Sequence, residues 1–173
     1  GPPMRIAQIA PTQGVVAGDF DGDGHADIYA LQNSHAPIPT VGRFDGGLSQ
    51  LLLGDGRGGF TAAAPRDTGL IVPGDGEALA TMDLGHDGWP DFLLTRHRSP
   101  TLAFRNHGVP GRHALRVVLR GSRGNPTAAG ARLTMALANG TTQTSEVYLG
   151  SGYISQSSGT CSFGFVNLNP PRR

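Results

Sequence analysis

Cysteine and lysine are almost absent from this sequence. The single thiol, Cys161, excludes an internal disulfide and any zinc site built from several cysteines. All 14 basic residues are arginines, which excludes lysine-based catalysis. No apolar run approaches the roughly 18 residues that indicate a membrane-spanning helix. The net charge of +1 gives no overall attraction to nucleic acid or to a membrane surface.

Glycine and proline, in contrast, are abundant, with 27 and 13 residues among 173. No segment of residues 1–110 carries a 3.6-residue apolar period over ten or more residues. This composition predicts an all-β protein with many short strands. The start, "GPPM", is interpreted as a cleavage scar and vector residues before Met4, and we expect that a natural leader has been cut away.

The sequence contains an internal repeat with an offset of 64 residues. "VVAGDFDGDGHADIYAL" (15–31) aligns with "LATMDLGHDGWPDFLLT" (79–95), and three aspartates and one glycine coincide. Each copy is followed by an apolar run that enters a glycine turn, "LLLGDGRGGF" (51–60) and "LAFRNHG" (102–108). The predicted unit is a strand, an acidic loop, a strand, a long connection, a further strand and a glycine turn.

The first acidic loop has the ligand spacing of a calcium site. Counted from Asp19, carboxylates occupy positions 1, 3, 5 and 9, a glycine at position 6 permits a sharp reversal, and position 7 offers a backbone carbonyl. An all-oxygen donor set selects hard cations, and six to eight flexible ligands favour Ca²⁺ over Mg²⁺. The predicted ligands are Asp19, Asp21, Asp23, Asp27 and the carbonyl of His25.

The second loop repeats this pattern with one carboxylate fewer, because Gly85 stands at position 3. Its predicted ligands are Asp83, Asp87, Asp91 and the carbonyl of Trp89. We therefore expect one or two Ca²⁺ ions per chain, with the first loop binding more strongly. Position 12 lacks the glutamate of an EF-hand in both copies. The alternative is a polar turn without an ion, and an arginine placed among the carboxylates would count against calcium.

The chain changes character near residue 110. Four segments at 113–121, 131–140, 143–150 and 161–168 are predicted strands, and "ANGTT" is typical of a hairpin turn. The expected organisation is a scar and leading segment at 1–13, two repeats at 14–110, a β domain at 111–168 and a frayed tail at 169–173.

Two known families resemble these segments. The acidic loops and the glycine turns resemble FG-GAP/VCBS repeats of integrin-α-like β-propellers, in which a Ca²⁺ loop joins two strands of each blade. The segment from "HALRVVLRG" through "GSGYISQSS" to "FGF" is similar to the ASPIC/UnbV domain, which follows such repeats in secreted bacterial proteins and in cartilage acidic protein. The resemblance implies propeller-type repeats followed by a β-sandwich-like domain. Two repeats are too few to close a propeller, so either the chain is the end of a longer protein or the repeats form a small compact β structure.

Other chemistry-bearing residues favour ordinary structural roles. The six histidines and the serines of "GSGYISQSSG" lack the context of a zinc site or of a catalytic triad. Trp89 and Tyr153 are candidates for stacking on sugars, although packing is the simpler interpretation.

The expected function is a non-catalytic calcium-binding module of an extracellular or cell-surface protein, in adhesion or matrix interaction. The alternatives are a carbohydrate-binding module and an accessory domain of a secreted enzyme. The expected partner is an extracellular protein or a glycan, not nucleic acid, and dimerisation through an exposed strand edge is a further expectation.

Overall fold

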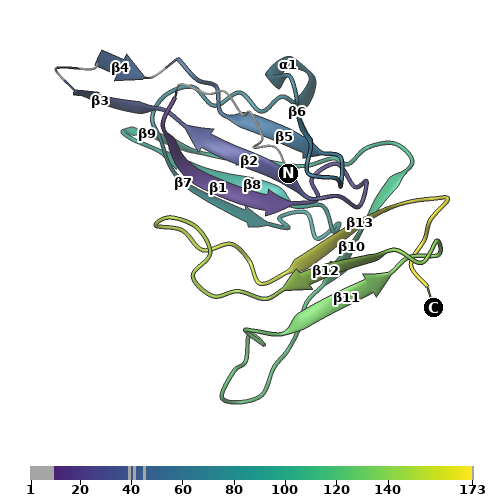
Figure 1. Cartoon of the computed structure of the whole chain (residues 1–173). Coiled ribbons are helices and arrows are strands. Elements are labelled where there is room, and N and C mark those ends of the chain that lie inside the picture. The colour runs from purple at the N-terminus through teal and green to yellow at the C-terminus, as the bar shows by residue number, and fades with distance from the viewer. Residues whose placement is uncertain (1–9, 39, 41, 45, 173) are drawn as a thin grey trace.

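The fold was analysed in a computed structural model that describes residues 10–172, apart from residues 39, 41 and 45. The predicted cleavage scar before Met4 lies outside this part of the chain. The described chain consists of antiparallel strands with one four-residue helix, which confirms the all-β prediction (Figure 1). The strands form a two-sheet unit from the repeats and a smaller C-terminal unit.

The first repeat forms a four-stranded antiparallel sheet in the order β1-β2-β5-β6. These strands are β1 (Thr12–Gly18), β2 (Asp27–Gln32), β5 (Gln50–Gly54) and β6 (Phe60–Ala62). The long connection between β2 and β5 contains a separate hairpin of β3 (Ser34–Ile38) and β4 (Gly42–Phe44). The first acidic loop is thus the tight connection between β1 and β2.

The second repeat forms a three-stranded sheet in the order β7-β8-β9. Its strands are β7 (Gly76–Met82), β8 (Asp91–Arg96) and β9 (Ser99–Phe104). The strand register repeats with the sequence, because Ala17 pairs with Ile28 and Thr81 pairs with Phe92, 64 residues further on. The internal repeat is therefore a repeat of strand pairing and not only of composition.

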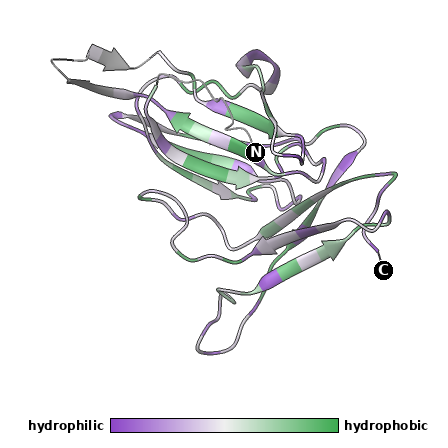
Figure 2. Ribbon diagram, viewed as in Figure 1, coloured by the Kyte–Doolittle hydropathy of each residue, from purple (hydrophilic) through white to green (hydrophobic). Residues whose placement is uncertain are grey.

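The two sheets pack face to face around one apolar core (Figure 2). Alternate residues of β1, β2, β7 and β8 point into this core, as the period of two in a strand requires. Tyr29 stacks on Phe92 with ring centroids 4.5 Å apart, and Phe20 meets Phe92 edge to face at 4.8 Å. The helix α1 (Pro65–Thr68) lies on the connection to the second repeat, ahead of the buried residues Leu70 and Val72.

No closed propeller is present within the described residues. Two neighbouring sheets share a core, as adjacent propeller blades do, but they do not continue into a ring. The two sheets leave β6 and β9 as strand edges.

The C-terminal unit consists of two antiparallel ribbons. One pairs β10 (Arg112–Val117) with β13 (Cys161–Val166), and the other pairs β11 (Arg132–Ala136) with β12 (Thr142–Glu146). The ribbons enclose a second apolar core, which is consistent with a sandwich-like fold. Its buried members are Met135, Leu137, Val147, Cys161 and Phe163.

The predicted "ANGTT" turn does connect β11 to β12, although only Gly140 has a positive φ, of 90°. The Gly140 N–H donates to Leu137 O at 2.9 Å, and the Leu137 N–H donates to Thr141 O at 2.9 Å. This is a three-residue turn with a left-handed glycine, because Asn139 does not adopt the positive φ that a two-residue turn needs.

The predicted fraying of the tail at 169–173 is wrong for the residues that the structure describes. Ala138 N donates to Pro170 O and Arg172 N donates to Ala136 O, both at 2.8 Å. Pro171 also forms a β-bridge with Leu137, so the tail adds to the edge of β11. No helix of the described residues combines the length and apolarity needed to cross a membrane.

Candidate metal centre

The first acidic loop wraps around the side chain of Asp19. Its Oδ1 accepts the Gly22 N–H at 2.7 Å and the Asp23 N–H at 3.2 Å, and its Oδ2 accepts the Gly24 N–H at 2.8 Å. Gly22 and Gly24 both have a left-handed φ, of 78° and 91°. Glycine tolerates this region without steric cost, so the sequence "DGDG" allows the backbone to turn its N–H groups toward one carboxylate.

Asp27 joins the loop to the third strand of its sheet. This side chain is fully buried, and its Oδ2 accepts the Phe20 N–H at 2.8 Å while its Oδ1 accepts the Gly54 N–H at 2.9 Å. One carboxylate at the start of β2 therefore fixes the beginning of the loop and the end of β5. The position-9 aspartate has this structural role whether or not an ion is bound.

Three of the predicted ligands converge. One carboxylate oxygen from each of Asp19, Asp21 and Asp27 lies within 4.8 Å of the others. Two oxygens on opposite sides of one Ca²⁺ lie about 5 Å apart, twice the usual Ca–O distance. The three carboxylates therefore fit a single calcium ion, with further ligands to be supplied by carbonyls or water.

The other two predicted residues of this loop lie at its outer side. Asp23 Oδ1 accepts the His25 N–H at 2.9 Å, and Asp23 Oδ2 lies 4.0 Å from Arg112 Nη1. The His25 ring packs against Gly56, where a Cβ would collide with it. Asp23 is thus not among the converging carboxylates, and the His25 side chain points toward the glycine turn after β5.

Burial raises the pKa values of two carboxyl groups in the first loop. Loss of hydration raises the pKa of Asp19 from 3.8 to about 6, against the lowering effect of the Gly24 and Gly22 N–H groups. The negative charges of Asp23 and Asp27 raise it further. The pKa of Asp27 is also raised, mainly by its burial. These carboxylates lack sufficient positive charge nearby, and a bound cation would supply it.

An arginine from the C-terminal unit does contact this loop. Arg112, the first residue of β10, places Nη1 2.5 Å from Asp21 Oδ1 and donates to the Asp21 carbonyl at 3.0 Å. Both side chains are partly buried. Arg112 neutralises Asp21 from one side, and among the described residues no cationic side chain forms an ion pair with Asp19 or Asp27 on the inner side.

The second loop repeats the hydrogen-bond frame of the first. Asp83 Oδ1 accepts the Asp87 N–H and its Oδ2 accepts the Gly88 N–H, both at 3.1 Å. Asp91 is 1% exposed, and it accepts the Leu84 N–H and the Asn106 N–H, both at 2.7 Å. These bonds correspond to those of Asp27 with Phe20 and Gly54.

The charges around the second loop differ from those around the first. Arg116 of β10 places Nε 2.9 Å from Asp83 Oδ2, and Arg105 places Nη2 3.2 Å from Asp87 Oδ2. The three aspartates of this loop do not form a converging cluster of the kind seen in the first. The backbone N–H of Trp89 donates to Asp87 Oδ1 at 3.1 Å.

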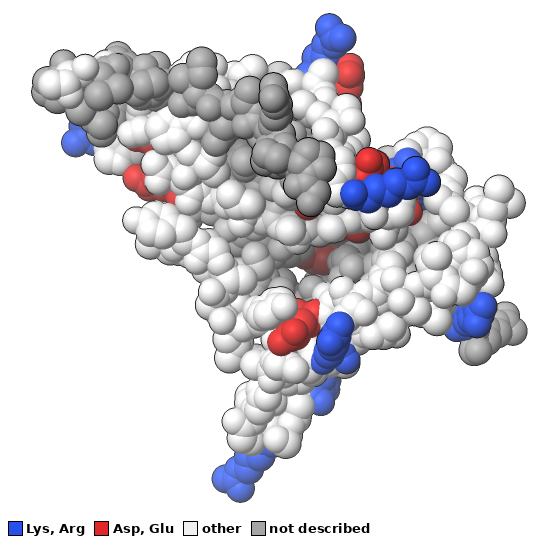
Figure 3. Space-filling model, in the orientation of Figure 1, with Lys and Arg blue, Asp and Glu red and all other residues white. Residues whose placement is uncertain are grey.

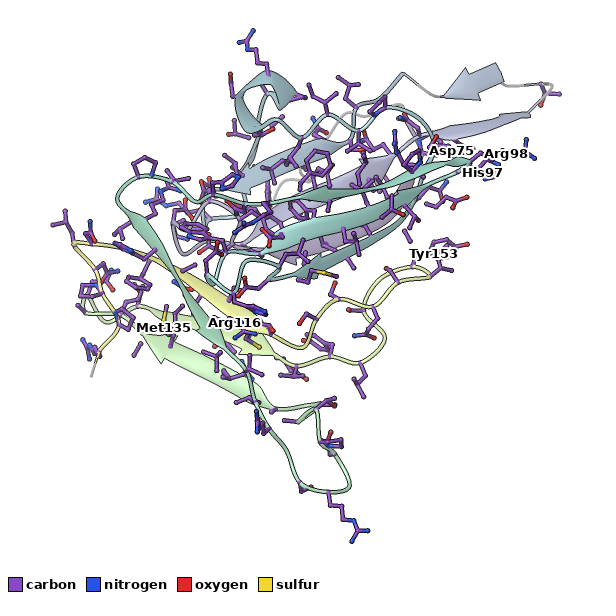
Figure 4. All side chains as sticks on the ribbon, turned by 180° about the vertical axis from the view of Figure 1, so that it is seen from behind. Asp75, His97, Arg98, Arg116, Met135 and Tyr153 are labelled. Atoms are coloured by element: carbon purple, nitrogen blue, oxygen red, sulfur yellow. The ribbon has the colours of Figure 1, made fainter. Side chains whose placement is uncertain are left out.

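Some of the acidic atoms line the recess between the two units, as the red atoms in the middle of Figure 3 show. Strand β10 lies beside both loops, and Figure 4 shows Arg116 on the side of the C-terminal unit that faces the repeats. Sequence analysis missed Arg105, Arg112 and Arg116. Arginines in a strand and at a turn have no motif, and only the packing of the two units brings them to the loops.

The sugar-stacking candidates are placed differently from each other. The Trp89 ring packs against Gly22 and Gly108, where a Cβ would lie 2.5 Å and 2.6 Å from ring atoms. Tyr153 is 62% exposed at the end of a loop, far from the metal candidates (Figure 4). Trp89 therefore serves as packing between the two loops, and the two aromatic rings do not form one binding surface.

Comparison with protein families concerns the C-terminal unit. Residues 121–170 match the ASPIC and UnbV family model. The ASPIC/UnbV match begins after β10 and includes β11, β12 and β13, which supports that part of the sequence resemblance. The repeats at 14–110 lie outside the match. No curated protein matches the sequence.

Asn106 connects the second repeat to the first loop. Its Nδ2 donates to the Phe20 carbonyl at 2.7 Å, and its Oδ1 accepts the Gly108 N–H at 2.9 Å. We expect Asn106→Ala to lower the free energy of unfolding by about 1 to 2 kcal/mol, because two partly buried hydrogen bonds are lost. Urea unfolding measures this loss.

Asn125→Ala is the matched control for that change. Asn125 also makes two side-chain bonds to the backbone, but both go to Ala129 in one exposed turn. Its replacement should cost less than half as much. Equal losses for the two variants would contradict a role for Asn106 in holding the repeats together.

Proposed function

We propose that this chain is a non-catalytic calcium-binding module of an extracellular or cell-surface protein, with a role in adhesion or matrix interaction. The observation that carries the proposal is the convergence of Asp19, Asp21 and Asp27 in a loop where Asp27 is buried and the other two are partly buried. Oxygen donors at this spacing suit Ca²⁺, and the millimolar calcium outside cells suits sites of modest affinity. The first loop is the stronger candidate, because the second offers fewer oxygen ligands.

We further propose that residues 14–110 are two FG-GAP/VCBS-type repeats. Identical register in the two copies supports this, as do the corresponding bonds of Asp27 and Asp91. Two blade-like sheets packed on one core are what such repeats produce, and ASPIC/UnbV domains accompany them in the resemblance stated above. An extracellular protein or glycan is the proposed partner, and the edges at β6 and β9 are candidate surfaces for dimerisation.

Calcium would act in this module by stabilising the fold. The loop holds several negative charges within nine residues, and the unfolded chain does not pre-form the site. An ion that binds only the folded loop adds its binding energy to the stability of the protein. The ion would thereby fix β1, β2 and the end of β5 relative to one another, because Asp19 and Asp27 contact all three segments.

The test compares thermal unfolding in excess EDTA with unfolding in about 10 mM Ca²⁺. For a dissociation constant of about 10⁻⁴ to 10⁻³ M, calcium should stabilise the protein by about 1.4 to 2.7 kcal/mol. That corresponds to an increase in Tm of about 3 to 10 °C for a chain of this size. Mg²⁺ at the same concentration should give a much smaller shift, because it gives up its waters reluctantly. Identical melting curves in EDTA and in calcium would refute the proposal.

A further inference from the structure

The second acidic loop already contains a cation that belongs to the chain. Arg116 Nε lies 2.9 Å from Oδ2 of Asp83, a side chain that is only 2% exposed. The same Oδ2 accepts the Gly88 N–H at 3.1 Å, and Oδ1 accepts the Asp87 N–H. Asp19 also has three donors, but all of them are neutral backbone N–H groups. One of the three donors around Asp83 is a guanidinium, and its positive charge disfavours a divalent ion as a further partner.

A second guanidinium takes the place where the first loop has an additional carboxylate. Arg105 Nη2 lies 3.2 Å from Asp87 Oδ2. A Cβ placed on Gly85 would collide with this same Nη2 atom and would lie 2.8 Å from Asp87 Oδ2. The first loop has Asp21 at the corresponding position 3, and Asp21 is one of the three converging ligands.

The formal charges of the two loops differ accordingly. The first has four aspartates and one arginine contact, a balance of 1 − 4 = −3. The second has three aspartates and two arginine contacts, a balance of 2 − 3 = −1. A divalent ion would bring the first loop to −3 + 2 = −1 and the second to −1 + 2 = +1, so only the second loop would acquire a net positive charge inside a partly buried site.

We infer that Arg116, assisted by Arg105, is the resident cation of the second loop, and that this loop holds no divalent ion. The inference refines the proposed function, on which it rests for the ion of the first loop. It replaces the expectation of a weak second calcium site with a different chemistry, because the residues around Asp83 and Asp87 do not fit a metal.

The arrangement also explains how the C-terminal unit is attached to the repeats. Arg112 and Arg116 are four residues apart on β10, so their side chains leave the same face of the strand. One contacts the first loop and the other contacts the second. Between them the backbone of Ala114 approaches the second loop so closely that a Cβ on Gly88 would lie 2.8 Å from its carbonyl oxygen. Arg116 is thus both a counter-charge and a tie between the units.

The first experiment counts the ions bound to the intact chain by native mass spectrometry in excess Ca²⁺. We expect one ion, lost in Asp21→Asn and retained in Asp87→Asn. Two ions in the wild type, or loss of the single ion in Asp87→Asn alone, would overturn the inference. No ion at all would refute the proposed function of the first loop while agreeing with an ion-free second loop, which the second experiment then decides.

The second experiment is a double-mutant cycle in EDTA with Arg116→Met, Asp83→Asn and the double variant. Arg116→Met leaves a buried carboxylate without its counter-charge and should lower Tm by about 4 to 8 °C. The double variant should lose clearly less than the sum of the two single losses. Arg120→Met, in which an exposed arginine beyond β10 is replaced, is the control for the change in net charge and should shift Tm by less than about 2 °C. Additive losses, or equal shifts for Arg116→Met and Arg120→Met, would overturn the inference.

Discussion

Asp27→Asn should abolish the response to calcium, whereas Asp91→Asn should preserve it. The two aspartates are a matched pair, since both are almost fully buried and each accepts two backbone N–H groups at corresponding places in its repeat. An asparagine can accept only through its one oxygen, so its NH₂ group would face a backbone donor. Each variant should therefore lose about 2 to 3 kcal/mol of stability in EDTA.

The two variants differ once calcium is added. Asp27 is one of the three converging ligands, so Asp27→Asn should also forfeit the stabilisation that the ion gives to the wild type. Its total loss in about 10 mM Ca²⁺ should reach about 4 to 5 kcal/mol, a decrease in Tm of about 8 to 20 °C. Asp91→Asn should show the same loss with and without calcium, because arginines neutralise its loop.

Thermal unfolding monitored by circular dichroism, for each variant in EDTA and in calcium, measures the loss of stability in all four cases. Comparable stability of the two variants in EDTA would confirm that the pair is matched structurally. Loss of the calcium response in both variants would place an ion in each loop. An unchanged response in Asp27→Asn would remove this residue from the site.

The repeat is the part of the fold that the sequence predicts best. An offset of 64 residues between the acidic loops reappears as the same strand register, because turn chemistry and alternating apolar positions determine the pairing locally. Gly54 and Asn106 occupy equivalent places in the two glycine turns, since their N–H groups donate to the equivalent aspartates Asp27 and Asp91. Here the spacing between β2 and β5 exceeds that between β8 and β9 because the β3–β4 hairpin is inserted.

What the sequence did not reveal depends on contacts between segments far apart in the chain. Arg112 and Arg116 follow the predicted boundary near residue 110, and local sequence gives no reason to associate them with loops up to 91 residues away. Trp89 lies in a loop, where the sequence gives no sign of burial, but its ring packs against Gly22 and Gly108. The tail was expected to fray because it is short and proline-rich, yet the open edge of β11 provides backbone partners for it.

The converging carboxylates also predict opposite pH dependences with and without calcium. In EDTA, Asp19 keeps its proton up to a pKa of about 6 in the folded state, against 3.8 in the unfolded chain. Between these values the folded state binds more protons than the unfolded state, so stability should fall as pH rises from about 4 to about 6. The raised pKa of Asp27 acts in the same direction. The rise in the pKa of Asp19 from 3.8 to about 6 corresponds to a loss of about 2 to 3 kcal/mol in the free energy of unfolding over this pH range.

Calcium should reverse this trend, because the ion binds the ionised carboxylates and competes with their protons. Apparent calcium affinity should decrease as pH falls below about 6, and melting curves in EDTA and in calcium should converge near pH 4 to 5. Asp19→Asn should flatten the EDTA profile, with Asp27 responsible for the remaining slope. If the calcium-dependent increase in Tm were as large at pH 4.5 as at pH 7, proton competition would be excluded, and the ion would have to bind away from Asp19.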